Sequence, residues 1–328
     1  MLLHGPAGIG KIDFAKRLAA FWLCETPAVD ESCGHCPSCR FVALDHHPDL
    51  QLIRPEAVAL LEGLERGEGE EGETAAASDA DDEKSGKRGP SHEIRIAQIQ
   101  SLIQSTVVGS HRAGRRVIVI YPAEAMNTFT ANALLKLLEE PPSANHLILV
   151  SDAPHRLLPT VLSRCQQVAL PPADQESAVH WLETQGVNDV AGWLSEAGGA
   201  PLLAWRAAGA DDAVLEARRV LLSGLARGPG LDALVLAERI ARIERGVVVG
   251  WLQRWTWDLL SYRLAARIRY YPREESAIAA LARGLDPLRL ARYARTLSSL
   301  RRAADHPLNA RLFFEDLLLR YARSVARA

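Results

Sequence analysis

A glycine-rich loop near the N-terminus constrains the fold of this chain more than any other feature. Gly5, Gly8 and Gly10 precede Lys11, between a short apolar stub and an amphipathic stretch. The segment matches the first seven positions of G-x-x-x-x-G-K-[ST], in which backbone N–H groups surround phosphate and the lysine reaches the terminal phosphates. The flanking pattern predicts a strand before the loop and a helix after it. The sequence therefore predicts an α/β domain built around a phosphate loop.

Further apolar runs predict four more strands of the same domain. They are residues 48–53, 117–120, 147–150 and 168–170. Helix-period runs separate them, including one from Ile94 and one over residues 128–140, so we expect a parallel sheet. Beyond Pro171 the pattern predicts only helices, interrupted at glycines and prolines.

The composition changes abruptly over residues 56–90. This segment holds eleven Asp or Glu against four Lys or Arg, with many small residues and few large apolar ones. Such a composition is typical of a disordered acidic loop. Because each doubling of the length of a surface loop adds only about 0.6 kcal/mol to the free energy of closing it, we expect the insertion to leave the fold intact.

Length and charge limit the class of protein. With 328 residues, of which 48% are apolar and 24% charged, the chain is expected to be soluble and to contain two or three domains. The formal net charge of −2 predicts no global attraction to nucleic acid. No apolar run is long enough to span a bilayer, so we expect a cytoplasmic protein without a membrane partner.

The phosphate loop lacks the groups that hydrolysis needs. Ile12 occupies the position of the hydroxyl that would bind magnesium, and Tyr121 and Pro122 follow a buried strand where Asp and Glu would hold the metal and orient water. Glu124 is the nearest acid, but it lies beyond a proline and out of register. We expect no ATP hydrolysis in cis, whereas nucleotide binding stays open because the glycines and Lys11 are present.

A cysteine cluster follows the predicted first helix. Its members are Cys24, Cys33, Cys36 and Cys39, which include two overlapping C-x-x-C units. In a reducing cytosol this pattern favours structural Zn²⁺ with four thiolate ligands over disulfides, and a redox C-x-x-C pair is the main alternative. We interpret the nearby histidines, namely His35, His46 and His47, as exposed loop residues.

Several of these motifs together resemble the delta-prime subunit family of the bacterial DNA polymerase III clamp loader. The resemblance rests on the cysteine spacing inside a phosphate-loop domain, on the Asn-Ala-Leu-Leu-Lys-Leu-Leu-Glu-Glu-Pro-Pro run of residues 132–142, and on Ser163-Arg164-Cys165. The related gamma/tau motor subunits share the zinc module and the last motif. They carry Asp-Glu where this chain has Tyr121-Pro122, so the sequence is identified as delta-prime-like.

The resemblance implies a fold and a set of partners. The fold is an AAA+ P-loop core over residues 1–170, with the zinc module at 24–39 and the acidic insertion at 56–90, then a helical lid over 171–208 and an all-α collar over 209–328. The implied partners are motor and delta subunits in a hetero-pentameric ring, and the sliding clamp and primed DNA through that complex.

It also implies roles for single residues. Arg164 corresponds to an arginine finger that enters the ATP site of a neighbouring motor subunit. Leu202 stands where active relatives carry a sensing arginine. Family members have a leading helix and a longer first strand before the glycine loop, so we expect a late-assigned start or a truncated fold, with an incomplete adenine pocket.

The leading hypothesis is therefore a non-hydrolysing clamp-loader subunit that is part of the DNA polymerase III holoenzyme. Two alternatives remain open from the sequence. One is an active gamma/tau-type ATPase. The other is a zinc-dependent nucleic-acid-binding protein with a vestigial phosphate loop.

Overall fold

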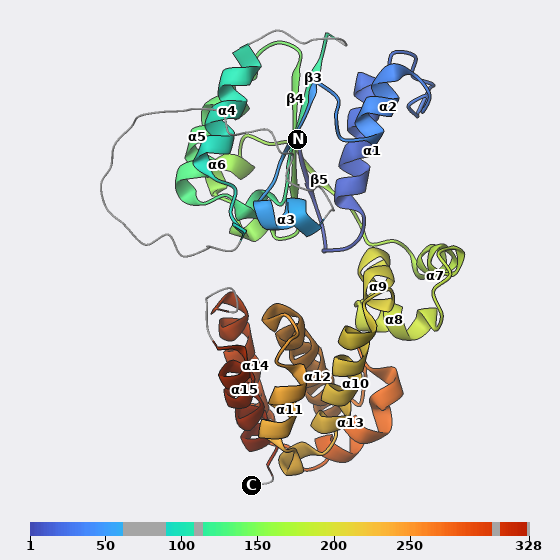
Figure 1. The fold of residues 1–328 in the computed structure, drawn as a ribbon, viewed down its shortest axis with the longest axis vertical. Helices are drawn as coiled ribbons and strands as arrows, with labels where there is room; N and C mark the ends of the chain where they lie inside the picture. The colour runs from blue at the N-terminus through green and yellow to red at the C-terminus, as the bar shows by residue number, and fades with distance from the viewer. Residues whose placement is uncertain (62–89, 108–113, 304–308, 327–328) are drawn as a thin grey trace. The chain divides into compact units, whose positions relative to one another are not determined.

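The computed structural model describes residues 1–61, 90–107, 114–303 and 309–326. The chain divides into two compact units, Met1–Pro172 and Ala173–Ala328, which are drawn in Figure 1. Within the described residues, no helix is long and apolar enough to cross a bilayer.

The first unit is built on a five-stranded parallel sheet with the strand order β2-β3-β4-β1-β5. The strands are β1 (Leu2–His4), β2 (Leu50–Ile53), β3 (Arg116–Ile120), β4 (Asn145–Ser151) and β5 (Gln167–Ala169). All five strands were predicted from apolar runs, and the prediction of a parallel sheet is confirmed. Because the strands are parallel, the loops after β1, β3 and β4 leave the sheet at the same edge.

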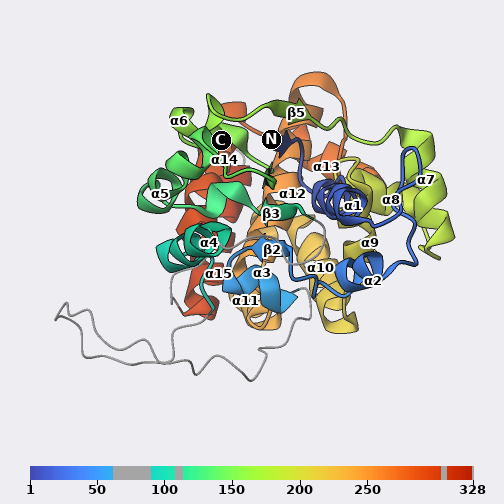
Figure 2. The same cartoon turned by 90° about the horizontal axis from the view of Figure 1, so that it is seen from above.

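Helices cover both faces of this sheet (Figure 1). Successive strand residues point to opposite faces, so Ile118 and Ile120 of β3 join one hydrophobic cluster while Val117 and Val119 join another. The first face is covered by α4 (Ile96–Val107), α5 (Thr128–Glu139) and α6 (Pro159–Leu162), and the second by α1 (Lys11–Leu23) and α2 (Pro37–Ala43). Figure 2 shows the two groups of helices on opposite sides of the strands.

The acidic segment begins differently from the prediction. Residues 56–90 were expected to be disordered, but Glu56–Leu61 form the short helix α3. Ala57 is buried, and its N–H donates a hydrogen bond to the carbonyl of Ser91, which joins the two ends of the segment. Residues 62–89 lie outside the described part of the chain, so the rest of this prediction is not tested.

Every regular element described in the second unit is helical, as expected. The helices are α7 (Gln175–Thr184), α8 (Val190–Glu196), α9 (Pro201–Ala208), α10 (Asp212–Leu225), α11 (Ala233–Ile240), α12 (Arg245–Ala265), α13 (Glu275–Ala282), α14 (Pro287–Ala303) and α15 (Ala310–Val325). One hydrophobic cluster joins α7, α8 and α9, and a larger one joins α10 to α15. The expected lid and collar thus fall in one compact unit but have separate cores.

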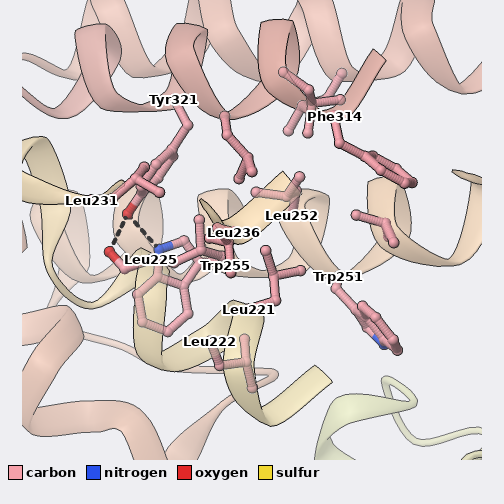
Figure 3. Close-up of a cluster of buried hydrophobic side chains, with 14 of the residues drawn as sticks. Leu221, Leu222, Leu225, Leu231, Leu236, Trp251, Leu252, Trp255, Phe314 and Tyr321 are labelled. Atoms are coloured by element: carbon pink, nitrogen blue, oxygen red, sulfur yellow. Dashed lines mark hydrogen bonds between the residues drawn. The ribbon is translucent and has the colours of Figure 1, made fainter. Parts of the chain in front are cut away.

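The larger core is organised around buried aromatic side chains (Figure 3). Trp255 on α12 and Tyr321 on α15 are fully buried, and the indole N–H donates to the Tyr321 hydroxyl at 2.9 Å. That hydroxyl in turn donates to the carbonyl of Leu225, the last residue of α10, at 2.8 Å. Three helices are therefore joined by two hydrogen bonds inside an apolar core.

Candidate functional site

The glycine loop connects β1 to the N-terminus of α1. A Cβ atom on Gly5 would lie 2.4 Å from the carbonyl oxygen of Leu170, so only glycine fits there without a backbone shift. Gly8 and Gly10 have φ values of 76° and 93°, in the left-handed region that favours glycine. Gly10 is the N-cap of α1 and has no side chain to cap it. The loop thus keeps the close turn that the sequence motif predicts.

Lys11, the first residue of α1, has an acidic partner. It is 4% exposed, and its Nζ lies 2.5 Å from Asp152 Oδ1 and contacts the carbonyl of Pro6. Asp152 follows directly after β4, the strand that neighbours β1 in the sheet. Asp152 was not predicted from the sequence. Its position just after a buried run was the available signal, but that run cannot be placed beside β1 without the strand order.

The end of β3 carries no acid at the two expected positions. Tyr121 and Pro122 follow the strand directly, and the short 3₁₀ helix Ala123–Ala125 comes next. Glu124 in this helix accepts a hydrogen bond from the backbone N–H of Asp152 at 2.9 Å through Oε1. Glu124 therefore reaches the same edge of the sheet by contacting the loop after β4, which its place beyond a proline did not predict.

The four predicted cysteine ligands converge between α1 and α2. Their Sγ atoms all lie within 4.8 Å of one another, and Cys24 ends α1 while Cys36 is the N-cap of α2. Backbone N–H groups of Cys33, Cys36 and Cys39 each donate to a cluster sulfur at 3.3 to 3.4 Å. This arrangement can hold a metal ion with four sulfur ligands.

The environments of these sulfurs differ. Hydrogen bonds from the Thr26 side chain and from the N–H groups of His35 and Cys36 lower the pKa of the Cys33 thiol to about 5. Burial raises the pKa of the Cys39 thiol to about 12. A bound cation would favour the thiolate form at every position, because metal ligands bind deprotonated.

The nearby histidines only partly match our interpretation. His35 is exposed, and its Nδ1 lies 2.7 Å from the carbonyl oxygen of Cys33. His47, by contrast, is only 2% exposed, and its Nδ1 accepts a hydrogen bond from the N–H of Asp49. The interpretation of His47 as an exposed loop residue was wrong, because its ring is packed inside the turn that leads into β2.

Arg164 lies just after α6, where Ser163 is the C-cap. The adjacent Cys165 is half-buried against the core beneath α6, and burial raises the pKa of its thiol. The guanidinium extends outward, and Nε donates to Glu139 Oε1 at 2.5 Å while Nη1 donates to the carbonyl of Thr160 at 3.1 Å. Nη2 also forms an ion pair with Glu139 Oε1, Nη1 reaches the Ser163 hydroxyl at 3.4 Å, and the Arg164 side chain is 33% exposed.

The predicted residues thus lie at three places: the phosphate loop, the cysteine cluster, and the segment after α6. Leu202, the remaining position discussed from the sequence, is in the first turn of α9 and is half-buried.

Comparisons with known proteins match both units. A family model described as "DNA polymerase III, delta subunit" matches residues 1–174, and one described as "DNA polymerase III, delta subunit, C terminal" matches residues 213–323. DNA polymerase III subunit delta' of Pseudomonas aeruginosa is 35% identical over 80% of this chain and 72% of its own length. Its namesake in Escherichia coli is 26% identical over 98% and 87%. Subunit tau of Escherichia coli is 28% identical over 56% of this chain but only 23% of tau.

Proposed function

Because this chain belongs to the delta-prime family of DNA polymerase III clamp-loader subunits, we propose that it acts in the loader without hydrolysing ATP itself. It assists ATP-dependent loading of the sliding clamp onto primed DNA. Its partners are the motor and delta subunits of a hetero-pentameric ring, through which it meets the clamp and DNA.

The main support for this proposal comes from the residues at the carboxyl edge of the sheet. Hydrolysis at a phosphate loop needs an acid at the end of a buried strand of the same sheet, which the sequence motif places after β3, to hold magnesium and orient water. Here Tyr121 and Pro122 follow β3, Ile12 offers no hydroxyl and packs beside the core, and Lys11 is already paired with Asp152. The residues present do not fit a magnesium-bound triphosphate.

The experiment is ATP turnover by the purified chain with magnesium. We expect a rate no higher than that of the Lys11→Ala variant, because the variant lacks the one cation of the loop. Turnover that is abolished by Lys11→Ala would refute the proposal and favour a motor subunit of the gamma/tau type.

Arg164 supports a catalytic role in trans. An arginine finger stabilises the charge that develops on a transferring phosphoryl group, and such fingers contribute about 10³ to 10⁵ in rate. Glu139 and the Thr160 carbonyl hold the guanidinium at the surface, where the Arg164 side chain is one-third exposed. The half-buried Cys165 beside it fixes the backbone, so the arginine is presented from a packed element. We assign Arg164 to the ATP site of the neighbouring motor subunit.

Zn²⁺ is the metal we assign to the cysteine cluster. Zinc–sulfur bonds are about 2.3 Å long, so a tetrahedral ion separates its sulfurs by about 3.8 Å. The Sγ separations of 4.0 Å between Cys24 and Cys36 and of 3.9 Å between Cys33 and Cys39 support such a site. A disulfide would need about 2.0 Å. Four protein ligands leave no open position, so the ion has a structural role in ordering the segment between α1 and α2.

A further inference from the structure

The lysine of the phosphate loop already has a counter-ion from another part of the chain. Lys11, which in this motif would reach the terminal phosphates, is buried, and its Nζ pairs with Asp152 Oδ1 at 2.5 Å. The carbonyl of Pro6, within the loop itself, also contacts this ammonium group. The charge that would attract phosphate is therefore already satisfied by groups of the same chain.

Burial of Lys11 makes its partner hard to replace. The Lys11 side chain is 3% exposed, so an incoming anion cannot take Lys11 without first removing Asp152 from it. A buried ammonium group left without a partner is strongly unfavourable, and a stable partner is therefore retained. Asp152 itself is 46% exposed in its side chain and lies in a loop, so its carboxylate can be removed without leaving a void in the core.

A second carboxylate reinforces the effect. Glu124 Oε1 accepts the backbone N–H of Asp152, which orients the loop that carries the aspartate. Among the described residues, its other oxygen is buried and has no hydrogen-bond partner. Lys11, Asp152 and Glu124 together carry a formal charge of −1, so these three side chains repel an approaching polyphosphate.

We propose that Asp152 determines the ligand specificity of this loop: its carboxylate occupies the place of a phosphate on Lys11 and so excludes polyphosphate anions, including nucleoside triphosphates. The glycine backbone and the N-terminus of α1 keep the shape of an anion site behind it. Removal of the carboxylate alone therefore opens the loop to a polyphosphate. This inference concerns binding in cis and does not depend on the role of Arg164.

The test compares the full chain with its Asp152→Asn variant. Asparagine keeps the shape of the side chain and the backbone N–H that Glu124 accepts. Binding of inorganic tripolyphosphate, and of ATP without magnesium, is measured by titration calorimetry. Asp13→Asn is the matched control, because Asp13 is an exposed acid in the first turn of α1 and its replacement removes the same charge near the loop.

We expect Asp152→Asn to bind tripolyphosphate at least about tenfold more tightly than the unchanged chain. The Asp13→Asn variant should show little change, and Lys11→Ala added to Asp152→Asn should abolish the gain. Equal affinity in the unchanged chain and Asp152→Asn would overturn the proposal, as would an equal gain in Asp13→Asn. Asp152→Ser is measured in parallel, and thermal unfolding confirms that each variant is folded before its affinity is compared.

Discussion

Replacement of Tyr321 by phenylalanine tests the packing of the C-terminal unit. The hydroxyl accepts from the Trp255 indole N–H and donates to the Leu225 carbonyl, all in a fully buried setting (Figure 3). Leu225 is the last residue of α10, so its carbonyl has no partner within that helix. Phenylalanine would leave both groups unsatisfied.

The expected cost follows from these two partners. Each buried polar group left without a hydrogen bond costs about 1–3 kcal/mol, so for two groups we expect the free energy of unfolding to fall by about 2–6 kcal/mol. Tyr293 provides the control. Its hydroxyl is also buried, but it donates to the carbonyl of Leu317, which lies inside α15 and already accepts the helical N–H four residues on. Tyr293→Phe should therefore cost about 1 kcal/mol or less.

The assay is denaturant unfolding followed by the fluorescence of the buried tryptophans in this unit, Trp251 and Trp255. The two variants are compared with the unchanged chain under the same conditions. A cost of Tyr321→Phe no larger than that of Tyr293→Phe would refute the role of these two hydrogen bonds. That result would mean that the indole N–H and the α10 carbonyl find other partners, and that the hydrogen bonds in the core contribute little.

Two further predictions concern the metal cluster and a buried acid. Metal analysis of the purified protein should give one zinc ion per chain. Replacing Cys36 by serine should reduce the zinc content and lower the melting temperature, whereas replacing Cys165 by serine should leave the zinc content unchanged. An equal zinc content in both variants would argue against a zinc site in the cysteine cluster. Burial raises the pKa of the Asp258 carboxyl, although it accepts hydrogen bonds from the N–H groups of Tyr270 and Tyr271. The folded state then holds the proton more tightly than the unfolded chain, so this group's contribution is present at acidic pH and is lost as pH rises through the raised pKa. Unfolding measured as pH rises from about 4, the ordinary pKa of an aspartate, should show this loss in the unchanged chain and not in Asp258→Asn. Identical profiles would contradict the assignment.

Most of the fold could be predicted because burial leaves a regular pattern in the sequence. The run Val117 to Ile120 lies inside the sheet, between β2 and β4, and is covered on both faces, so it forms an unbroken apolar segment. The cysteine cluster was equally predictable, because its ligand spacing is local. Helix α3 was missed because its few apolar residues lie at the edge of a strongly acidic segment, whose composition dominated the prediction.

The ion pairs at the candidate sites could not be predicted in the same way. Asp152 meets Lys11 only because β4 lies next to β1, and Glu139 meets Arg164 only because α5 and α6 cover the same face of the sheet. A single acidic residue after a strand or near a helix end forms no sequence pattern from which its basic partner could be predicted. Such contacts depend on tertiary arrangement, so they emerge only from the structure.

The most direct test of the central claim is ATP hydrolysis by a loader reconstituted from this chain with motor and delta subunits on primed DNA. Arg164→Ala is compared with Arg156→Ala, which removes an exposed arginine from the same unit. Single-turnover hydrolysis at the motor site beside this subunit should fall by about 10³ to 10⁵ for Arg164→Ala and stay unchanged for Arg156→Ala, with assembly intact in both. An unchanged hydrolysis rate in a fully assembled Arg164→Ala complex would contradict the account.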